Sequence, residues 1–513
     1  MQLSQLIEGL QTCSIQGSIQ RDIKNISFNS KEIGADCLFV ALKGTRVNGH
    51  DYIPEALASG AQALIVEEDT HTEHDITIIR VPDTRIALAN VADCFYQHPS
   101  RKLTVIGITG TNGKTTISYL LESILKEAGH NPGVIGTIDY RFGTHHRAAP
   151  NTTPNALDLQ KIMKEMVDAG VSHLIVEVSS HALDQHRVEA LNFDVAVFTN
   201  LSPEHLDYHD TLEQYAEAKK LLFTYYINQS TKEKTSAVIN CDDPLGDSLC
   251  TATKAQMLRY GITEGVEISV KKSTLTSDGL SMLVTTPKGD VEIHSSLIGT
   301  FNSENILAAA GAALTQDCPL ATIKKGIAQV NLIPGRLERV PNSKGLTILI
   351  DYAHTSDALD HVLTVLRSLC SGRLITVFGC GGDRDKTKRG PMGDTATRKS
   401  DLTIITSDNP RTEEPMDIIA QIETGIDQTA INCYDLNQLK DAGLHKAYTV
   451  IAQRRAAIRT AVRFTKPGDI LLVAGKGHED YQIIGTTRHH FSDREEITEA
   501  LIGIPHEIEA LPQ

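Results

Sequence analysis

The heptapeptide GTNGKTT at residues 110–116 combines glycines, a lysine and hydroxyl groups, the residue types of a phosphate-binding loop. It follows residues 104–108, which are β-branched and apolar, as is typical of a buried parallel strand. Backbone N–H groups of such a loop converge on one point, where Lys114 adds a positive charge and Thr115 a hydroxyl for phosphate-bound Mg²⁺. A helix that starts after the loop directs the positive end of its dipole there. The sequence therefore predicts a nucleotide loop made of Gly110, Thr111, Asn112, Gly113, Lys114, Thr115 and Thr116.

The spacing of this loop departs from the usual pattern G-x-x-x-x-G-K-[ST]. Five residues before Gly113 the chain has Ile108, and glycines stand at positions 107 and 110 instead. A glycine-rich turn with an incidental lysine is the alternative, but strand, glycines, Lys-Thr pair and helix together favour a nucleotide site. A dinucleotide site is disfavoured because G-x-G-x-x-G is absent. The loop alone does not separate ATP from GTP, or an enzyme from a switch.

Polar side chains that follow other strands of this region could hold a metal ion. Glu177 ends the apolar segment HLIVEV, where a carboxylate could bind Mg²⁺ opposite the loop or, alternatively, cap the next helix. His205 follows a further strand, in TNLSPEHLDYHD. Lys219 lies on a helix predicted to begin near Leu212, and a lysine on a helix is usually solvated, so the residues alone do not single it out.

Hydrogen-bond donors and a guanidinium follow the Glu177 strand and could bind an anion. In SSHALDQHRV, Gln185 and Arg187 could hold a carboxylate or a sugar phosphate. The segment NTTP at residues 151–154 offers further donors. Ordinary turn chemistry is the alternative for each of them.

The last third of the chain contains four apolar strands that each end in polar, glycine-rich or charged residues. DYAH places Asp351 and His354 at the first strand end, and SDNPR places Asp408, Asn409 and Arg411 at another. GKGHE follows the fourth strand, and GGDRDKTKRG, after a strand, concentrates the basic residues Arg384, Lys386, Lys388 and Arg389. Ligands gather at the carboxyl ends of strands in open α/β sheets, so four such ends indicate a binding site.

Three regions position these residues. Residues 1–98 contain short strand patterns such as CLFVAL and AQALIVEE. Residues 99–333 alternate apolar strands with helical segments around 157–169 and 215–226, which predicts a parallel sheet covered by helices. Pro334 and Gly335 break the chain before the third region, residues 334–513. We expect an α/β protein of three domains: a small N-terminal α/β domain, a central domain with a parallel sheet of the phosphate-loop type, and a Rossmann-like C-terminal domain.

Composition limits the classes of function. The 513 residues are too many for one ordinary core. The net charge of −15 argues against general nucleic-acid binding but allows a local basic pocket. Nine scattered cysteines without a C-x-x-C pair suggest reduced, cytosolic thiols rather than a disulfide framework or a zinc site. The N-terminus does not read as a signal peptide, and no run is long enough to span a bilayer.

These motifs, taken in order over almost the whole chain, resemble the Mur ligases, ATP-dependent amide-forming enzymes of peptidoglycan synthesis. The resemblance rests on GTNGKTT, NTTP, EVSSHALDQHRV, TNLSPEHLDYH, YAEAKKLLF, GTFNSEN, PGRLE, DYAHT, GGDRDK, DNPR and GKGHE. It also explains the unusual loop, because G-T-N-G-K-T-T is the form that the family uses.

The resemblance implies roles for residues that the sequence alone leaves ambiguous. It implies that Lys219 is carbamylated and so becomes an anionic ligand for a second Mg²⁺ beside His205. ATP contacts are implied at Asn305, Arg336, Asp351 and His354, and metal ligation at Thr115, Glu177, His205 and Lys219. The implied UDP-sugar site contains Phe28, Ser30, Thr45, Arg46, Val47, Asn151, Thr152, Thr153, Ser179, Gln185 and Arg187. The implied amino-acid site contains Arg384, Asp408, Asn409, Pro410, Arg411, Gly475 and Glu479.

The activity that the resemblance implies is addition of meso-diaminopimelate to the D-Glu of UDP-MurNAc-L-Ala-D-Glu, through an acyl phosphate. Lys114, Lys219, His205 and Glu177 would be the catalytic residues, with ATP as co-substrate and Mg²⁺ as cofactor. The expected enzyme is a cytoplasmic monomer with small-molecule substrates and no nucleic-acid or membrane partner. The alternatives are a lysine-adding Mur ligase, a ligase like folylpolyglutamate synthase, and a nucleotide-driven switch without amide chemistry.

Overall fold

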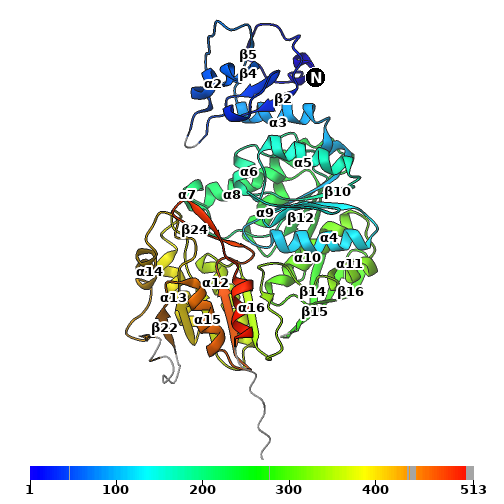
Figure 1. The fold of residues 1–513 in the computed structure, drawn as a ribbon. Helices are drawn as coiled ribbons and strands as arrows, with labels where there is room; N and C mark the ends of the chain where they lie inside the picture. Colours follow the sequence, from blue (N-terminus) through cyan, green and yellow to red (C-terminus); the bar gives the residue numbers. More distant parts are fainter. Residues whose placement is uncertain (45–46, 277, 436–437, 439–445, 504–513) are drawn as a thin grey trace, which may run out of the picture.

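The computed structural model describes residues 1–44, 47–276, 278–435, 438 and 446–503, and its three main sheets follow one another along the chain (Figure 1). Each of these sheets lies within one of the three regions predicted from the sequence, which confirms the three-domain α/β fold. We propose that the domain boundaries lie between residues 98 and 99 and between residues 333 and 334. Among the described residues, no helix has the length and apolar character needed to cross a bilayer.

The N-terminal domain is a five-stranded sheet with strand order β1-β5-β4-β3-β2, parallel except for the β1–β5 pair. Its strands are short because each apolar run is short. The elements are α1 (Leu3–Leu6), β1 (Ser14–Gln16), β2 (Asn25–Ser27), β3 (Cys37–Val40), α2 (Ile53–Ala58), β4 (Ala61–Val66), β5 (Thr77–Arg80) and α3 (Thr84–Phe95). Helix α3 packs against α5 and joins this domain to the next one (Figure 1).

The central domain is an eleven-stranded sheet with strand order β16-β15-β14-β13-β12-β11-β6-β10-β7-β8-β9. The strands are β6 (Thr104–Thr109), β7 (Pro132–Ile135), β8 (Asp139–Phe142), β9 (His145–Ala148), β10 (His173–Glu177), β11 (Val195–Phe198), β12 (Ser236–Asn240), β13 (Gln256–Gly261), β14 (Ile268–Thr276), β15 (Gly279–Thr286) and β16 (Gly289–Ser295). The helices are α4 (Lys114–Glu127), α5 (Ala156–Asp168), α6 (Ser180–Asp184), α7 (Leu206–His209), α8 (Leu212–Leu221), α9 (Pro244–Ala252), α10 (Phe301–Thr315) and α11 (Leu320–Ala328).

Alternation along the central strands sends side chains into two cores. In β6, Ile106 and Ile108 join the core under α4, α10 and α11, whereas Val105 joins the core under α5. A strand buried on both faces reads as a continuous apolar run, as predicted for residues 104–108. The strands β10, β6 and β11 are parallel neighbours, so their carboxyl ends meet at one edge.

The C-terminal domain is a seven-stranded sheet with strand order β17-β18-β23-β19-β20-β22-β21, followed by a two-stranded hairpin. Its elements are β17 (Glu338–Arg339), β18 (Thr347–Asp351), α12 (Ser356–Leu369), β19 (Leu374–Phe378), α13 (Arg389–Lys399), β20 (Leu402–Ile405), α14 (Pro415–Glu423), β21 (Asn432–Cys433), β22 (Ala447–Val450), α15 (Arg454–Phe464), β23 (Ile470–Ala474), β24 (Tyr481–Ile484), β25 (Thr487–His490) and α16 (Asp493–Ile502). The four strands whose ends carry polar motifs, β18, β23, β19 and β20, are adjacent and parallel.

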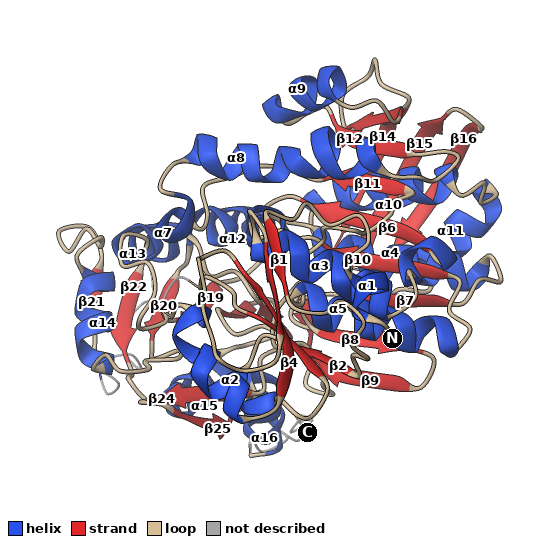
Figure 2. Cartoon of the chain, turned by 90° about the horizontal axis from the view of Figure 1, so that it is seen from above, coloured by secondary structure: helices blue, strands red, loops and turns tan. Residues whose placement is uncertain are grey.

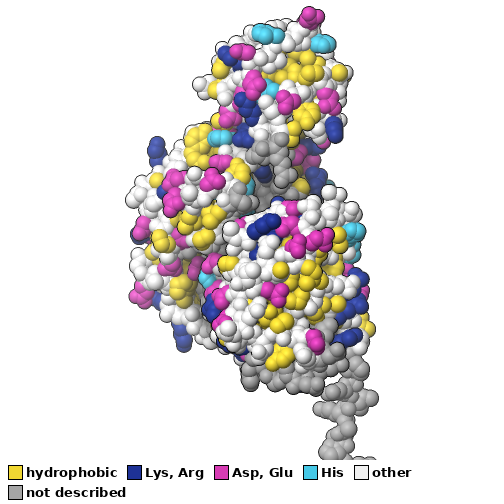
Figure 3. Space-filling view, turned by 90° about the vertical axis from the view of Figure 1, so that its left-hand side faces the viewer, with side chains coloured by type: hydrophobic (Ala, Val, Ile, Leu, Met, Phe, Trp, Pro, Cys, Tyr) yellow, Lys and Arg dark blue, Asp and Glu magenta, His cyan; other side chains and the backbone are white. Residues whose placement is uncertain are grey.

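The three domains form a bent stack with the central domain in the middle (Figures 1 and 2). The face in Figure 3 mixes acidic and basic side chains and does not gather one sign of charge into a single patch. The chain crosses from the central to the C-terminal domain near residues 331–337. Ile298 of the central domain belongs to the hydrophobic core of the C-terminal domain, which includes Leu349 and Leu363, so the two domains share part of a core.

Candidate active site

The loop after β6 has the backbone that phosphate binding requires. Gly110 and Gly113 have φ values of 146° and 90°, in the region that favours glycine. A Cβ on Gly113 would lie 2.2 Å from Asn305 Oδ1, so the loop also needs glycine for its close approach to α10. Helix α4 begins at Lys114, directly after the loop. Asn305, implied as an ATP contact, therefore lies against the phosphate loop.

Lys114 is folded over the loop that it belongs to. Its Nζ donates to the carbonyl oxygens of Gly110 and Thr111, each at 2.7 Å. Burial lowers the pKa of Lys114, while the charges of Glu204 and Glu177 oppose that shift. Both contacts are with backbone oxygens. An incoming phosphate can therefore bind the ammonium group of Lys114 without breaking an ion pair.

Glu177 faces the loop from the neighbouring strand. Its carboxylate accepts from Thr115 Oγ1 at 3.0 Å and from Thr137 Oγ1 at 2.8 Å. The side chain is buried, and Gly136 leaves the room for it, since a Cβ there would lie 2.4 Å from Glu177 Oε1. The Thr115 hydroxyl and the Glu177 carboxylate are the hard oxygen donors that Mg²⁺ prefers.

A second cluster lies after β11, and its central residue is Glu204, which the sequence analysis did not single out. Glu204 Oε1 lies 3.5 Å from His354 Nε2 of the C-terminal domain and 3.9 Å from His205 Nε2. Burial alone would raise the pKa of Glu204, but the neighbouring His354, His205 and Lys114 lower it well below its usual range. Glu204 is therefore a carboxylate of the central domain that also contacts the C-terminal domain. Its position directly before His205 at a strand end could have identified it as a candidate site residue from the sequence.

Lys219 is almost completely buried on α8 rather than solvated. Its side chain is 1% exposed, and its Nζ lies 4.2 Å from the centre of the Tyr215 ring. Burial, together with the charge of Lys114, lowers the pKa of Lys219 well below its usual value. Within the described part of the chain, its ammonium group has no hydrogen bond or ion pair. Burial therefore shifts this lysine toward its neutral amine form.

The fit of these residues to metal ions differs between the two clusters. The described residues contain no group of three or more His, Cys, Asp or Glu side chains arranged for a metal. Thr115 and Glu177 nevertheless offer oxygen ligands to an Mg²⁺ that phosphates would complete. His205 and an unmodified Lys219 do not suit Mg²⁺, which binds oxygen donors; a carbamate on Lys219 would supply them.

The C-terminal domain contributes Arg336, Asp351 and His354 to this centre. Arg336 Nη2 lies 3.5 Å from Thr115 Oγ1, and its guanidinium carbon lies 4.8 Å from the centre of the Tyr352 ring. The Asp351 carboxylate accepts from the backbone N–H groups of Leu337 and Ala353, both at 2.7 Å. Asp351 therefore fixes the chain just after Arg336, and burial raises its pKa.

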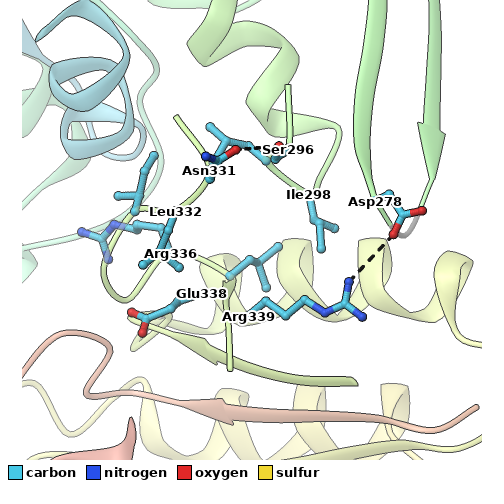
Figure 4. A pocket seen from close by; sticks show the side chains of 11 residues that line it. Asp278, Ser296, Ile298, Asn331, Leu332, Arg336, Glu338 and Arg339 are labelled. Carbon is cyan, nitrogen blue, oxygen red and sulfur yellow. Dashed lines mark hydrogen bonds and ion pairs between the residues drawn. The ribbon is translucent and has the colours of Figure 1, made fainter. Parts of the chain in front are cut away.

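A cavity of about 170 Å³ adjoins Arg336 where the two domains meet (Figure 4). Across it Arg339 Nη1 lies 3.9 Å from Asp278 Oδ1, and Asn331 Oδ1 accepts from Ser296 Oγ at 3.3 Å. In Figure 4 the Arg336 guanidinium points away from Arg339 and Asp278. The cavity marks the junction between the domains and is separate from the phosphate loop.

Two guanidinium groups at the ends of β19 and β20 have only backbone partners. Arg411 Nη1 donates to Gly382 O at 2.7 Å, and Arg384 Nη1 lies 3.4 Å from Asp383 O. No carboxylate pairs with either of them in the described ranges. Both lie beside Gly381, where an added Cβ would be 3.0 Å from Arg411 Nη1 and 3.8 Å from Arg384 Cγ. This arrangement can receive a carboxylate from a ligand.

Glu479 is held by Asn409, which lies two residues before Arg411. Asn409 Nδ2 donates to Glu479 Oε2 at 2.9 Å. Glu479 is partly exposed, and Pro410 and Gly475 are buried next to the pair. Asp408 is different, because its buried carboxylate faces Lys476 inside the domain. The structure thus brings together all seven residues implied for the amino acid but turns the side chain of Asp408 inward.

The basic cluster in GGDRDKTKRG divides into separate roles. Arg389 is completely buried and donates to Glu413, Gln421 and Gly381 O. The hydrogen bond from Arg389 lowers the pKa of Glu413 to about 2. Lys386 also lies 3.2 Å from Glu413. Arg389 therefore holds the start of α13 to Glu413 and to Gln421 of α14.

The residues implied for the UDP sugar lie on both sides of the junction between the N-terminal and central domains. Arg187 donates to Gln185 Oε1 at 2.8 Å and to Thr153 O at 2.9 Å. Ser179 caps α6 by accepting from Ala182 N, and Asn151 O accepts from the Tyr140 hydroxyl. On the N-terminal side Ser30 donates to Glu55, Phe28 is partly buried and Val47 is exposed. Thr45 and Arg46 lie outside the described residues, and Thr152 contacts Thr137 at 3.1 Å.

Comparison with known protein families matches three successive segments of the chain. "Mur ligase family, catalytic domain" matches residues 22–96, "Mur ligase middle domain" matches residues 108–313, and "Mur ligase, glutamate ligase domain" matches residues 335–477. The chain belongs to the Mur ligase family, as its motifs indicated.

Full-length relatives agree with this assignment. A UDP-N-acetylmuramoyl-L-alanyl-D-glutamate–2,6-diaminopimelate ligase of Geobacter metallireducens is 45% identical over 501 residues, which is 98% of both chains. The ligase of the same name from Clostridioides difficile is 40% identical over 98% of this chain and 99% of its own. A solved structure with that name covers 98% of this chain and 99% of its own, with 31% identity and a TM-score of 0.69.

Proposed function

We propose that this protein is an ATP-dependent, ADP-forming amide ligase that joins an amino acid to a nucleotide-linked peptide. More specifically, it adds meso-diaminopimelate to the D-Glu of UDP-MurNAc-L-Ala-D-Glu and makes the UDP-MurNAc-tripeptide. It acts as a monomer in the cytoplasm, where peptidoglycan precursors for cell-wall growth, cell shape and cell division are assembled. The full-length relatives named for this reaction support the assignment.

One observation carries the choice of amine. Among the described residues the guanidinium groups of Arg411 and Arg384 have only backbone partners, and the Glu479 carboxylate is held by Asn409, two residues before Arg411. meso-Diaminopimelate carries a carboxylate and an ammonium group at its distal end, whereas lysine carries only the ammonium group. The pocket therefore offers a complementary partner to each distal group of diaminopimelate.

The reaction must activate a carboxylate, because its oxygens are poor leaving groups. Transfer of the γ-phosphoryl group of ATP to the D-Glu carboxylate forms an acyl phosphate and ADP. The amine then attacks the acyl carbon, and phosphate leaves from the tetrahedral intermediate with loss of a proton from nitrogen. Lys114 would hold the γ-phosphate and offset the charge of two anions that approach each other. Mg²⁺ held by Thr115 and Glu177 would neutralise further phosphate charge.

Lys219 has a separate task in this proposal. Its buried, neutral amine can attack CO₂ to form a carbamate, and the proton lost from nitrogen goes to solvent. The product is an anion with two oxygens beside His205, which makes it a suitable ligand for a second Mg²⁺. Asn305, Arg336, Asp351 and His354 would hold the rest of ATP, which lies between the central and C-terminal domains.

The UDP sugar would bind between the N-terminal and central domains. Arg187 and Gln185 would bind its anionic groups, with Ser179 and the 151–153 segment as further donors. Phe28, Ser30 and residues 45–47 would contribute from the N-terminal domain. Closure of the C-terminal domain would then bring the amine to the acyl phosphate and exclude water that hydrolyses it.

The test measures phosphate release with UDP-MurNAc-L-Ala-D-Glu and ATP while the amine is varied. We expect release that depends on both the UDP substrate and an amine, with meso-diaminopimelate far more efficient than L-lysine. Equal efficiency would identify a less selective ligase. Nucleotide binding without substrate-dependent release of ADP would replace the ligase assignment with a nucleotide-driven switch.

A further inference from the structure

Lys476, directly after β23, is a completely buried lysine with three oxygen neighbours. Its Nζ lies 3.0 Å from Asn409 Oδ1, 3.2 Å from Asp408 Oδ1 and 3.3 Å from Glu479 Oε2. The Asn409 and Glu479 oxygens accept hydrogen bonds from the ammonium group, and the Asp408 oxygen forms an ion pair with it. A buried charge is unfavourable without such partners, so the ammonium group of Lys476 must keep these oxygens close to it. Lys476 thereby connects the loop after β20 to the loop after β23.

The contacts of Lys476 fix how Asn409 faces the pocket. Asn409 Oδ1 accepts from Lys476 Nζ and from the backbone N–H of Ile483, both at 3.0 Å. Its Nδ2 is consequently turned toward Glu479. The amide cannot flip without losing these bonds and placing N–H groups against the ammonium group of Lys476. The Glu479 carboxylate is thus held from two sides.

A second buried cation anchors the end of β23, next to the loop that contains Lys476. Arg454 at the start of α15 is bound by Asp493 through Nε at 2.8 Å and Nη2 at 2.6 Å, and Nη2 also donates to Ala474 O. Both side chains of this pair are 0% exposed. Burial would raise the pKa of Asp408, but the charges of Lys476 and Arg454 outweigh it and lower that pKa. Asp408 therefore remains an anion beside Lys476.

We propose that Lys476 is a positioning residue that holds Glu479 and Asn409 at the spacing from Arg411 required for selectivity toward the amine. This inference rests on the proposed function. Because Lys476 is completely buried, it acts through its neighbours and does not contact the substrate. meso-Diaminopimelate must meet Glu479 and the guanidinium groups at the same time, whereas lysine needs only Glu479. A displaced Glu479 therefore weakens diaminopimelate more than lysine.

The experiment compares wild type with Lys476→Met and Lys476→Arg. For each, kcat and KM are measured for diaminopimelate, lysine, ATP and the UDP substrate, together with the affinity for Mg-ATP. Loss of one buried charged partner predicts a rise of about 30-fold in KM for diaminopimelate in Lys476→Met. KM for ATP and for the UDP substrate should stay within about twofold, because those sites are on other strand ends. The preference for diaminopimelate over lysine should fall by about tenfold.

Lys476→Arg carries the test if the methionine variant fails to fold, because it keeps the buried charge. A planar guanidinium cannot reproduce three contacts arranged around an ammonium group, so the preference should still fall. Lys466→Met, at an exposed lysine of the same domain, is the matched control and should behave as wild type. An arginine variant with wild-type KM and wild-type preference overturns the inference. If the wild type uses an amine other than diaminopimelate, the proposed function is wrong. In that case a wild-type KM for the amine that is used, in both Lys476→Met and Lys476→Arg, would still refute the positioning role.

Discussion

Two buried lysines of this protein occupy opposite environments, and their expected chemistry differs for that reason. Lys476 has three oxygen neighbours within 3.3 Å. The Nζ atom of Lys219 lies 4.2 Å from the centre of the Tyr215 ring. Within the described part of the chain, Lys219 has no hydrogen bond or ion pair. The first environment suits a structural ammonium group, while burial in the second shifts the lysine toward the neutral amine that the proposed carbamate requires. Burial alone therefore does not define the role of a lysine.

Replacement of Lys219 by alanine should abolish ligation while the protein stays folded. Alanine cannot form a carbamate, so the anionic oxygens proposed beside His205 are lost. Short-chain carboxylic acids added to the assay should restore part of the activity, because they supply similar oxygens to the space left by the side chain. Mass spectrometry of the intact, fully active wild type should show the mass of CO₂ on this lysine. An unmodified lysine in a fully active enzyme would contradict the carbamate.

Replacement of Arg411 by alanine should mainly change the choice of amine. The variant removes a bidentate partner for the distal carboxylate, a loss of about 1.5–3 kcal/mol for a charged hydrogen bond, so kcat/KM for diaminopimelate should fall roughly 10- to 100-fold. Use of lysine, which lacks that carboxylate, should change little. Steady-state kinetics with both amines give the comparison, and Arg398→Ala, at an exposed arginine of α13, is the control. An unchanged preference would refute the assignment of this pocket.

The phosphate loop depends on geometry that only glycine provides. Gly113 combines a φ of 90° with a space where a Cβ would lie 2.2 Å from Asn305 Oδ1. Gly129, after the same helix, has a φ of 83° but nothing within 4 Å of an added Cβ. Gly129→Ala therefore measures backbone strain alone, about 1 kcal/mol of stability.

Gly113→Ala should reduce the affinity for ATP by at least tenfold, since the loop or α10 must shift to admit the methyl group. Gly129→Ala should lower stability slightly and leave nucleotide affinity unchanged. Calorimetric titration with Mg-ATP and denaturant unfolding of both variants provide the measurement. Equal effects of the two substitutions on the affinity for Mg-ATP would show that the close approach of Gly113 to Asn305 does not contribute to nucleotide binding.

His173, the first residue of β10, makes the stability of the folded protein depend on pH. His173 is 7% exposed, and its ring centre lies 4.2 Å from that of His130. Burial lowers the pKa of His173 to about 4, so the unfolded chain binds more protons than the folded one between about pH 4 and 6.5. Stability from this site is present above pH 6.5 and is lost as pH falls toward 4.

Between pH 7 and pH 5 this histidine should account for a loss on the order of 2 kcal/mol in the free energy of unfolding. His173→Gln should remove that part of the pH dependence. Urea unfolding at several pH values measures the slope for both proteins. His71→Gln, at an exposed histidine of the N-terminal domain, is the control and should leave the slope unchanged. Identical slopes in wild type and His173→Gln would contradict this origin.

Elements with a strong local pattern could be predicted from the sequence. The strands HLIVE, LITVF and LTII and the start of α8 at Leu212 follow from apolar runs and capping residues. Because parallel strands align their ends, the meeting of Asp351, Asn409 and GKGHE at one edge was also predictable. The ion pairs of Lys476 with Asp408 and of Arg454 with Asp493 were not, because they join residues 68 and 39 positions apart that meet only through burial. The same reason hid Glu204, whose partner His354 comes from another domain.

At the scale of the whole molecule, polar contacts join the central and C-terminal domains at the proposed nucleotide site. Glu204 lies 3.5 Å from His354, and Thr115 lies 3.5 Å from Arg336. Both pairs surround the phosphate loop and place one residue in each domain. ATP bound there would contact both domains at once, so its binding energy should stabilise them together.

Scanning calorimetry with and without Mg-ADP should therefore show the central and C-terminal domains moving together to higher temperature. At a concentration one hundred times Kd, the gain in free energy of unfolding is about 2.7 kcal/mol. A transition of the N-terminal domain, whose sheet is separate, should not shift. Lys114→Ala should remove the stabilisation, since the ligand then loses its main cation, while Lys126→Ala, on the same helix but away from the loop, should retain it. If only the central domain gains stability, the contacts between the domains do not respond to nucleotide, and the proposed closure over ATP is wrong.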